Sequence, residues 1–196
     1  MTEKIWAIVL AAGESSRMGS PKMLIPFRGK TMIETVIDNI LQSSVNKIVV
    51  VLGAYREEIS ARIKHLPVLT CYNANYRNGM LSSVQCGMRI LPPDFEAVFV
   101  FPGDQPLVEP DIIDKMLAEY RNSKKGIIIP VYRAKRGHPV LIDSKYREAV
   151  ENLDDSKGLR MLAEIYPDEV VELETNSPGI IKDFDNLSDF NVETTK

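Results

Sequence analysis

The stretch IWAIVLAAGESSRMGSPK, residues 5–22, decides the fold because it joins an apolar run to a loop of small and basic residues. Residues 5–11 are apolar without alternation, which is typical of a short strand buried on both faces. The loop matches neither common glycine template, since Ser20 rather than Lys follows Gly19 and no GxGxxG spacing is present. We therefore expect a first buried strand that leads into an unusual ligand-binding loop.

Strand-like and helix-like segments alternate through residue 123. The expected strands are 5–11, 47–53, 67–73 and 96–104, and the expected helices are 31–43, 55–65, 80–91 and 109–123. Thr31 and Glu34 form a capping box at the start of the first helix. This alternation predicts an α/β, Rossmann-like three-layer sandwich on a mostly parallel sheet. The C-terminal half is less regular and is expected to add mixed or antiparallel strands. With no repeat or linker, residues 1–196 are expected to form one domain.

The composition of the chain argues against several classes of protein. The net charge of −3 argues against a general nucleic-acid or membrane binder, which would carry a basic surplus. Cys71 and Cys86 have neither metal-type spacing nor a disulfide framework, and the N-terminal apolar patch is interpreted as a strand and not as a signal peptide. No apolar run approaches the roughly 20 residues of a membrane helix. These features predict a cytoplasmic protein.

The loop after the first strand is the first candidate site. Ala11, Ala12 and Gly13 are small, so their backbone can approach a ligand closely. Arg17 and Lys22 could bind phosphate oxygens, Arg17 through its planar fork and Lys22 as a point charge. The alternative is an ordinary strand-ending turn with solvated charges. If the strand order is 3-2-1-4, this loop lies beside the loop after the fourth strand, at the carboxyl ends where ligands bind in such sheets.

Carboxylates supply the second candidate group. Asp104 follows a buried strand in FVFPGDQPLV, 99–108, where it could bind Mg²⁺ together with substrate phosphates. Asp183 and Asp185 alternate along KDFDNLSDF, 182–190, and one of them could be a second metal ligand. The alternatives are a capping Asp and an acidic surface tail.

Polar residues elsewhere complete the candidates. Gly79, Ser82 and Ser83 stand at a helix start after Asn73, where they could meet an anion or a base edge, or serve only as an N-cap. His138, in GHPVLI at 137–142, could contact an acceptor substrate or brace a turn.

The order of these motifs resembles a known family. LAAGESSRMGSPK, NANYRNGMLSSV, GDQP, GHPV and DFDN together are similar to the MobA-like nucleotidyltransferases, over roughly residues 4–190. The resemblance is closest to the branch of molybdenum cofactor cytidylyltransferases, because LAAG replaces the LAGG of the guanylyltransferase branch. It implies a nucleotide-diphospho-sugar transferase-like fold. The chain departs from the family at DFDNLSD, where D-[IV]-D-T-P-E-D is common, and DDSKGLRML at 154–162 matches GDxGAR only loosely.

The resemblance also implies roles for individual residues. Arg17, Lys22 and Asp104 would be catalytic, Asp104 and Asp185 would hold the metal, and Asn73 and His138 would lie on the acceptor side. The nucleotide would be bound by Leu10, Ala11, Ala12, Gly13, Arg17, Lys22, Gly79, Ser82 and Ser83. The implied cofactor is Mg²⁺, which Mn²⁺ could replace. The implied partners are a nucleoside triphosphate, a phosphate-bearing small-molecule acceptor and a molybdoenzyme that receives the product.

The expected reaction is attack of an acceptor phosphate on the α-phosphorus of a nucleoside triphosphate, with CMP transferred from CTP to molybdopterin and pyrophosphate released. Such a nucleophile needs no Ser-His-Asp or Cys-His constellation, so catalysis would depend on positioning and charge neutralisation. The alternatives are a sugar- or polyol-phosphate nucleotidyltransferase, a GTP-dependent guanylyltransferase and a non-catalytic nucleotide- or pterin-binding delivery protein. A dinucleotide-dependent dehydrogenase is disfavoured, because no acidic residue ends the second strand.

Overall fold

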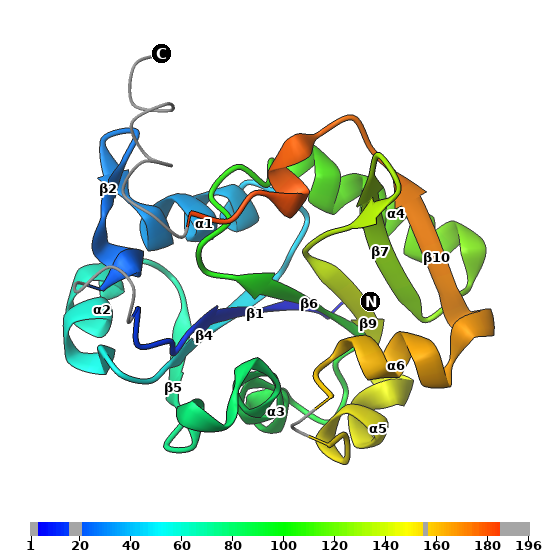
Figure 1. Ribbon diagram of the computed structural model, residues 1–196, viewed down its shortest axis with the longest axis horizontal. Helices are drawn as coiled ribbons and strands as arrows, with labels where there is room; N and C mark the ends of the chain where they lie inside the picture. The colour runs from blue at the N-terminus through cyan, green and yellow to red at the C-terminus, as the bar shows by residue number, and fades with distance from the viewer. Residues whose placement is uncertain (1–3, 16–20, 155–156, 185–196) are drawn as a thin grey trace.

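The computed structural model describes residues 4–15, 21–154 and 157–184 (Figure 1). Its centre is an eight-stranded sheet in the order β10-β7-β9-β6-β1-β4-β5, with β8 paired to β7. The strands are β1 Ile5–Ala11, β4 Lys47–Leu52, β5 Leu69–Tyr72, β6 Ala97–Pro102, β7 Ile127–Tyr132, β8 Lys135–Arg136, β9 Val140–Asp143 and β10 Val170–Glu174. A separate antiparallel pair, β2 Pro26–Phe27 and β3 Lys30–Thr31, has no counterpart in the sequence prediction.

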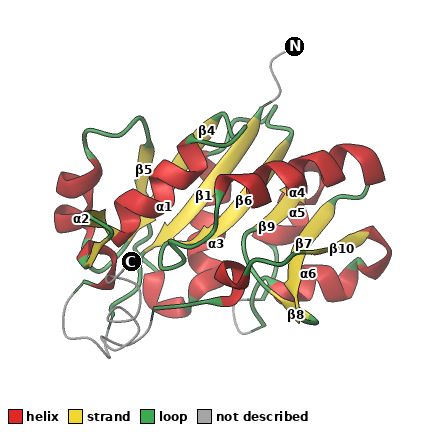
Figure 2. Cartoon of the chain, turned by 90° about the horizontal axis from the view of Figure 1, so that it is seen from above, coloured by secondary structure: helices red, strands yellow, loops and turns green. Residues whose placement is uncertain are grey.

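Helices cover both faces of this sheet, as Figures 1 and 2 show. One face carries α1 Met32–Leu41, α2 Arg56–Ile63 and α4 Pro110–Ser123, and the other carries α3 Met80–Ile90, α5 Arg147–Glu151 and α6 Arg160–Ile165. The short 3₁₀ turns are η1 Lys22–Leu24, η2 Tyr76–Asn78, η3 Ser144–Tyr146, η4 Pro167–Glu169 and η5 Pro178–Ile181. The predicted three-layer α/β sandwich is confirmed. So are its antiparallel additions in the C-terminal half, because β9 runs antiparallel to both β6 and β7.

Strand β1 is the central strand that the opening sequence predicts. It pairs in parallel with β4 on one side and β6 on the other. Its side chains alternate between the two cores: Val9 packs under α1 and α4, and Ile8 packs under α3. Both are fully buried, and burial of one such side chain stabilises the fold by about 1.5–3 kcal/mol. The expected order of the first four long strands, 3-2-1-4, is the observed order β5-β4-β1-β6.

Two glycines let the neighbouring loops approach the end of β1 closely. A Cβ at Gly53 would lie 2.3 Å from the backbone oxygen of Ala12, and a Cβ at Gly103 would lie 2.8 Å from that of Leu10. The backbone N–H of Gly103 donates to Leu10 O at 3.0 Å, and that of Ala54 donates to Ala12 O at 3.2 Å. The loop after β1 is therefore held between the loops after β4 and β6.

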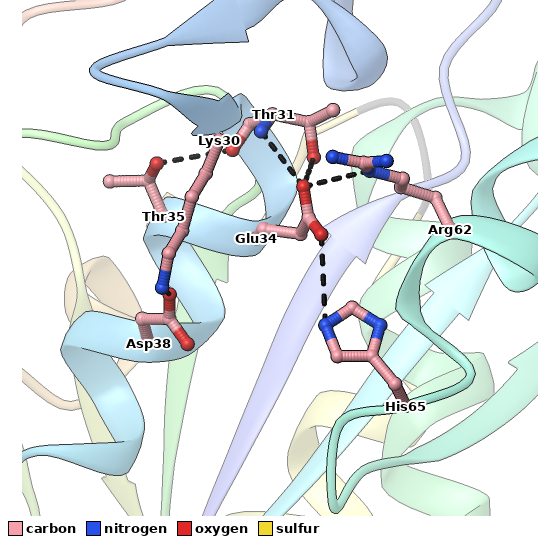
Figure 3. A network of polar contacts seen from close by, with 7 residues as sticks. All are labelled: Lys30, Thr31, Glu34, Thr35, Asp38, Arg62 and His65. Carbon is pink, nitrogen blue, oxygen red and sulfur yellow. Dashed lines mark hydrogen bonds and ion pairs between the residues drawn. The ribbon is translucent and has the colours of Figure 1, made fainter.

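A buried carboxylate fixes the start of α1 (Figure 3). The predicted capping box is confirmed, because Glu34 accepts hydrogen bonds from the N–H and hydroxyl of Thr31 at 2.8 and 2.6 Å. Arg62 of α2 donates to the same oxygen at 2.8 Å, and His65 lies 3.7 Å from the other. Burial alone would raise the pKa of Glu34, but the hydrogen bonds from Thr31 and Arg62 outweigh it and lower that pKa. This network ties α1 to α2.

Within the described part of the chain, every helix is too short or too polar to cross a lipid bilayer.

Candidate functional site

The site is built from loops at the carboxyl ends of β1 and β6. Leu10, Ala11 and Ala12 are buried at the end of β1, whereas Gly13 is exposed. The chain returns at Lys22, which begins η1 and whose backbone N–H donates to the Ser15 hydroxyl at 3.0 Å. Arg17 lies outside the described residues. The arrangement places the small-residue segment and Lys22 at the same end of the sheet.

Lys22 forms an ion pair with Asp104, the residue that follows β6. The Nζ–Oδ2 distance is 2.5 Å, and the two side chains are only 12% and 18% exposed. The structure thus brings together two residues that the sequence assigns to phosphate binding and metal binding. Their direct pairing could not be read from the sequence, because it depends on how closely the two loops approach.

Gln105 joins Asp183 to this pair and was missed by the sequence reasoning. Its side chain is 4% exposed, and Nε2 donates to Asp183 Oδ1 at 2.6 Å. The only signal was its place beside Asp104 in GDQP. Asp185, the other candidate for the second metal ligand, lies outside the described residues. Among the described residues, Asp183 is the C-terminal carboxylate that reaches the site.

His138 lies beside the same carboxylates. Its backbone N–H donates to Ile180 O in η5 at 2.8 Å, and a Cβ on the preceding Gly137 would lie 2.3 Å from that oxygen. Burial lowers the pKa of the His138 imidazole, while the charges of Asp183 and Asp104 oppose that shift. Both carboxylates therefore lie close enough to act on the imidazole, while burial favours its neutral form.

The residues predicted around the start of α3 form a separate, interlocked group. Asn73 Nδ2 donates to the hydroxyls of Ser82 and Ser83 at 2.9 and 3.0 Å, and all three side chains are buried. The Ser82 hydroxyl also lies 2.8 Å from Gly79 O, and Gly79 has the positive φ of 105° that favours glycine. Asn73 therefore packs with Ser82 and Ser83, and its predicted place on the acceptor side stays a prediction.

A cavity of about 160 Å³ has His138 among its lining residues. Its walls are mainly apolar and come from β7, β9 and α6, with Ile129, Val140 and Leu162 among them. Its polar groups are Arg136, His138 and Arg160, and Arg136 is also paired with Glu172 at 2.6 Å. The cavity and the carboxylate site therefore have His138 in common.

The oxygen donors of this site fit a divalent cation. Mg²⁺ and Mn²⁺ accept carboxylate oxygens, and Mg²⁺ is commonly held by one or two carboxylates together with substrate phosphates. Asp104 and Asp183 supply such oxygens, and Gln105 Oε1 is a buried acceptor that lacks a hydrogen-bond partner in the described structure. The parts of the chain that the structure describes hold no group of three or more His, Cys, Asp or Glu that could enclose a metal. A cation here would need the substrate to complete its ligands.

Comparisons with known proteins identify the family. Residues 7–171 match the MobA-like NTP transferase domain. The chain is 31% identical over 187 residues to the molybdenum cofactor cytidylyltransferase of Escherichia coli K12, covering 93% of this chain and 92% of that protein. It is also 31% identical over 131 residues to a probable molybdenum cofactor guanylyltransferase of Natranaerobius thermophilus, covering 67% of this chain and 62% of that protein.

Solved structures show the same fold. Rv0371c of Mycobacterium tuberculosis superposes with a TM-score of 0.88 over the full length of both chains, at 22% identity. A manganese complex of Rv0371c superposes with a TM-score of 0.83 at 21% identity, covering 98% of this chain and 100% of that one.

Proposed function

The chain belongs to the MobA-like NTP transferase domain family and is a nucleotidyltransferase, and on that premise we propose that it transfers CMP from CTP to a phosphate group of molybdopterin or its molybdenum-bearing form. The observation that carries this proposal is the Lys22–Asp104 pair at the carboxyl ends of β1 and β6. It supports the proposal because an ammonium group that could bind phosphate and a carboxylate that could bind a metal lie beside the small-residue end of β1.

The proposed reaction requires neutralisation of phosphate charge and in-line positioning of the two substrates. An oxygen of the acceptor phosphate forms a bond to the α-phosphorus of CTP. The bond from that phosphorus to the bridging oxygen of the β-phosphate breaks, and pyrophosphate leaves with the electron pair. Lys22 and Arg17 bind the departing phosphates, and the backbone of Leu10–Gly13 holds the nucleotide in line. Asp104 and a C-terminal aspartate would hold a Mg²⁺ or Mn²⁺ ion, which would neutralise phosphate charge during the transfer.

The nucleotide assignment depends on residue 12. Ala12 lies at the end of β1, where the guanylyltransferase branch has glycine, and its backbone oxygen is fixed by the Ala54 N–H. The choice of CTP over GTP is proposed from this resemblance, because LAAG is the form of the cytidylyltransferase branch.

The acceptor assignment is supported by the cavity beside His138. Its mainly apolar walls suit a flat heteroaromatic ring, and Arg160 and Arg136 at its polar side suit an anionic group. A sugar- or polyol-phosphate acceptor would bring many hydroxyls, which need hydrogen-bonding partners that these walls do not offer. We therefore favour a pterin acceptor over a sugar phosphate.

Two measurements test the proposal. In a thermal-shift panel of CTP, GTP, ATP and UTP with Mg²⁺, CTP should raise the Tm most, because a bound ligand stabilises the folded chain by mass action. Pyrophosphate release should then require both CTP and molybdopterin. A larger shift with GTP would contradict the cytidylyl assignment. Tight CTP binding without pyrophosphate release for any acceptor would indicate a delivery protein instead.

A further inference from the structure

Gln105 carries a buried polar atom that the protein itself does not satisfy. Its Oε1 has no hydrogen-bond partner within the described residues, although the side chain is 4% exposed. The orientation of the amide follows from its neighbour: an ionised carboxylate only accepts hydrogen bonds, so the NH₂ group must be the one that faces Asp183 at 2.6 Å. Oε1 is therefore a buried hydrogen-bond acceptor, of fixed orientation, that is left without a donor among the described residues.

The surroundings of Gln105 indicate what that donor is. Asp104 precedes Gln105 directly in the chain, and Asp183 accepts a hydrogen bond from the Gln105 amide nitrogen, so Gln105 connects the loop of Asp104 to the second carboxylate. A buried acceptor without a partner costs free energy of folding, whereas an apolar side chain of the same size would avoid that cost. Hydrated divalent cations bring waters whose O–H groups are strong donors.

We propose that Gln105 is a positioning residue for the divalent cation: Nε2 orients the Asp183 carboxylate, and Oε1 accepts a hydrogen bond from the hydration shell of the ion. This inference rests on the proposed function for the presence of the cation. It identifies Asp183 as the C-terminal carboxylate that serves the ion. Neighbouring groups that orient metal ligands commonly change metal affinity by about 10–100-fold when they are removed.

The experiment is titration of the full chain with Mn²⁺ in the presence of CTP and without acceptor, with free Mn²⁺ measured by electron paramagnetic resonance. Gln105→Met keeps the side-chain size but removes both polar contacts, and it should raise the Mn²⁺ Kd about 10–100-fold. Asp183→Asn should also weaken binding. The double variant should lose less than the product of the two single effects, because Gln105 acts partly through Asp183.

Asn39→Leu is the matched control. The Asn39 amide donates to Pro106 O and Val108 O at 3.0 Å each, so it supports the same loop from α1 without contacting the carboxylates. It should lower the Tm and leave the Mn²⁺ Kd within about twofold. If Gln105→Met binds Mn²⁺ like the unaltered chain, or Asn39→Leu weakens binding equally, the positioning role is wrong.

The same variants separate this inference from the proposed function. Gln105-dependent Mn²⁺ binding without CMP transfer to any acceptor would overturn the proposed function and leave the positioning role intact. If CMP transfer occurs but Gln105→Met binds Mn²⁺ as tightly as the unaltered chain, the proposed function stands and the positioning role is wrong. A chain that binds no Mn²⁺ with CTP present would overturn the cation assignment itself.

Discussion

The ammonium group of Lys22 lies 2.5 Å from a carboxylate oxygen of Asp104, so each of these residues neutralises the other when no substrate is bound. The proposed roles require both to change partners: Lys22 must turn to the triphosphate and Asp104 to the cation. Because both side chains are mostly buried, neither charge can be left alone without a substantial cost. Nucleotide and cation are therefore expected to bind together more favourably than either binds alone.

Replacement of Lys22 tests this exchange. Lys22→Ala should lower kcat by about 100-fold, since one charged contact to the leaving group is lost. It should also strengthen Mn²⁺ binding without nucleotide, because the competing ammonium is gone. Steady-state kinetics and Mn²⁺ titration measure the two effects. An unchanged kcat would contradict the assigned role, and weaker Mn²⁺ binding would contradict the competition.

Filling the cavity beside His138 tests the acceptor site. Ala163→Leu adds three carbons to a buried position on α6 that lines the cavity, and it should raise the KM for molybdopterin about tenfold while the KM for CTP stays nearly constant. Glu164→Leu adds apolar bulk to an exposed position on the same helix and serves as the control. Equal changes in both KM values would show that the cavity does not discriminate between the substrates.

A methyl group at Gly103 should force the two site loops apart. Its Cβ would lie 2.8 Å from Leu10 O and 2.9 Å from Met23 Sδ, next to Lys22. Gly103→Ala should therefore lower the free energy of unfolding by about 1–3 kcal/mol and reduce CTP binding. Gly13→Ala meets no atom within 4 Å and should change stability by less than about 0.5 kcal/mol in the same urea titrations. Similar losses for both variants would refute the steric argument.

The Glu34 network predicts a pH-dependent part of the stability. The folded-state pKa of Glu34 is lowered, so its contribution is present above the unfolded pKa of about 4.3 and is lost as pH falls through the folded value. Glu34→Gln should cost about 1–3 kcal/mol at pH 7, and that difference should shrink below about pH 4. Urea unfolding of both proteins from pH 3 to pH 7 measures it. A pH-independent difference would mean that the charge of Glu34 contributes nothing.

The sequence predicts the framework well because its signals are local. The continuous apolar run of residues 5–11 predicts β1 with its observed bounds, and the Thr31–Glu34 spacing predicts the start of α1. These features depend on side-chain periodicity and on hydrogen bonds between near neighbours. By contrast, the short hairpin of β2 and β3 carries no repeat long enough to reveal it.

The site is predictable only in part, because its contacts join distant segments. Lys22 and Asp104 could each be singled out from their motifs, yet nothing local indicates that they touch. The sequence gives no local signal for Gln105, because its contact with Asp183 joins residues 78 positions apart. Asn73 likewise bonds to Ser82 and Ser83, nine and ten positions away, and its place on the acceptor side stays a prediction. The predictions for Arg17 and Asp185 stay predictions.

The bond between Gln105 and Asp183 spans 78 positions of sequence. A ribosome therefore finishes β1, β6 and the Lys22–Asp104 pair long before the segment that completes the site emerges. The nascent chain can therefore pair β1 with β4 and β6 before Asp183, one of the two carboxylates proposed for the cation, has been made. On the proposed function, nucleotide transfer becomes possible only at a late stage of synthesis, when η5 lies against Gly137 and Asp183 has reached Gln105.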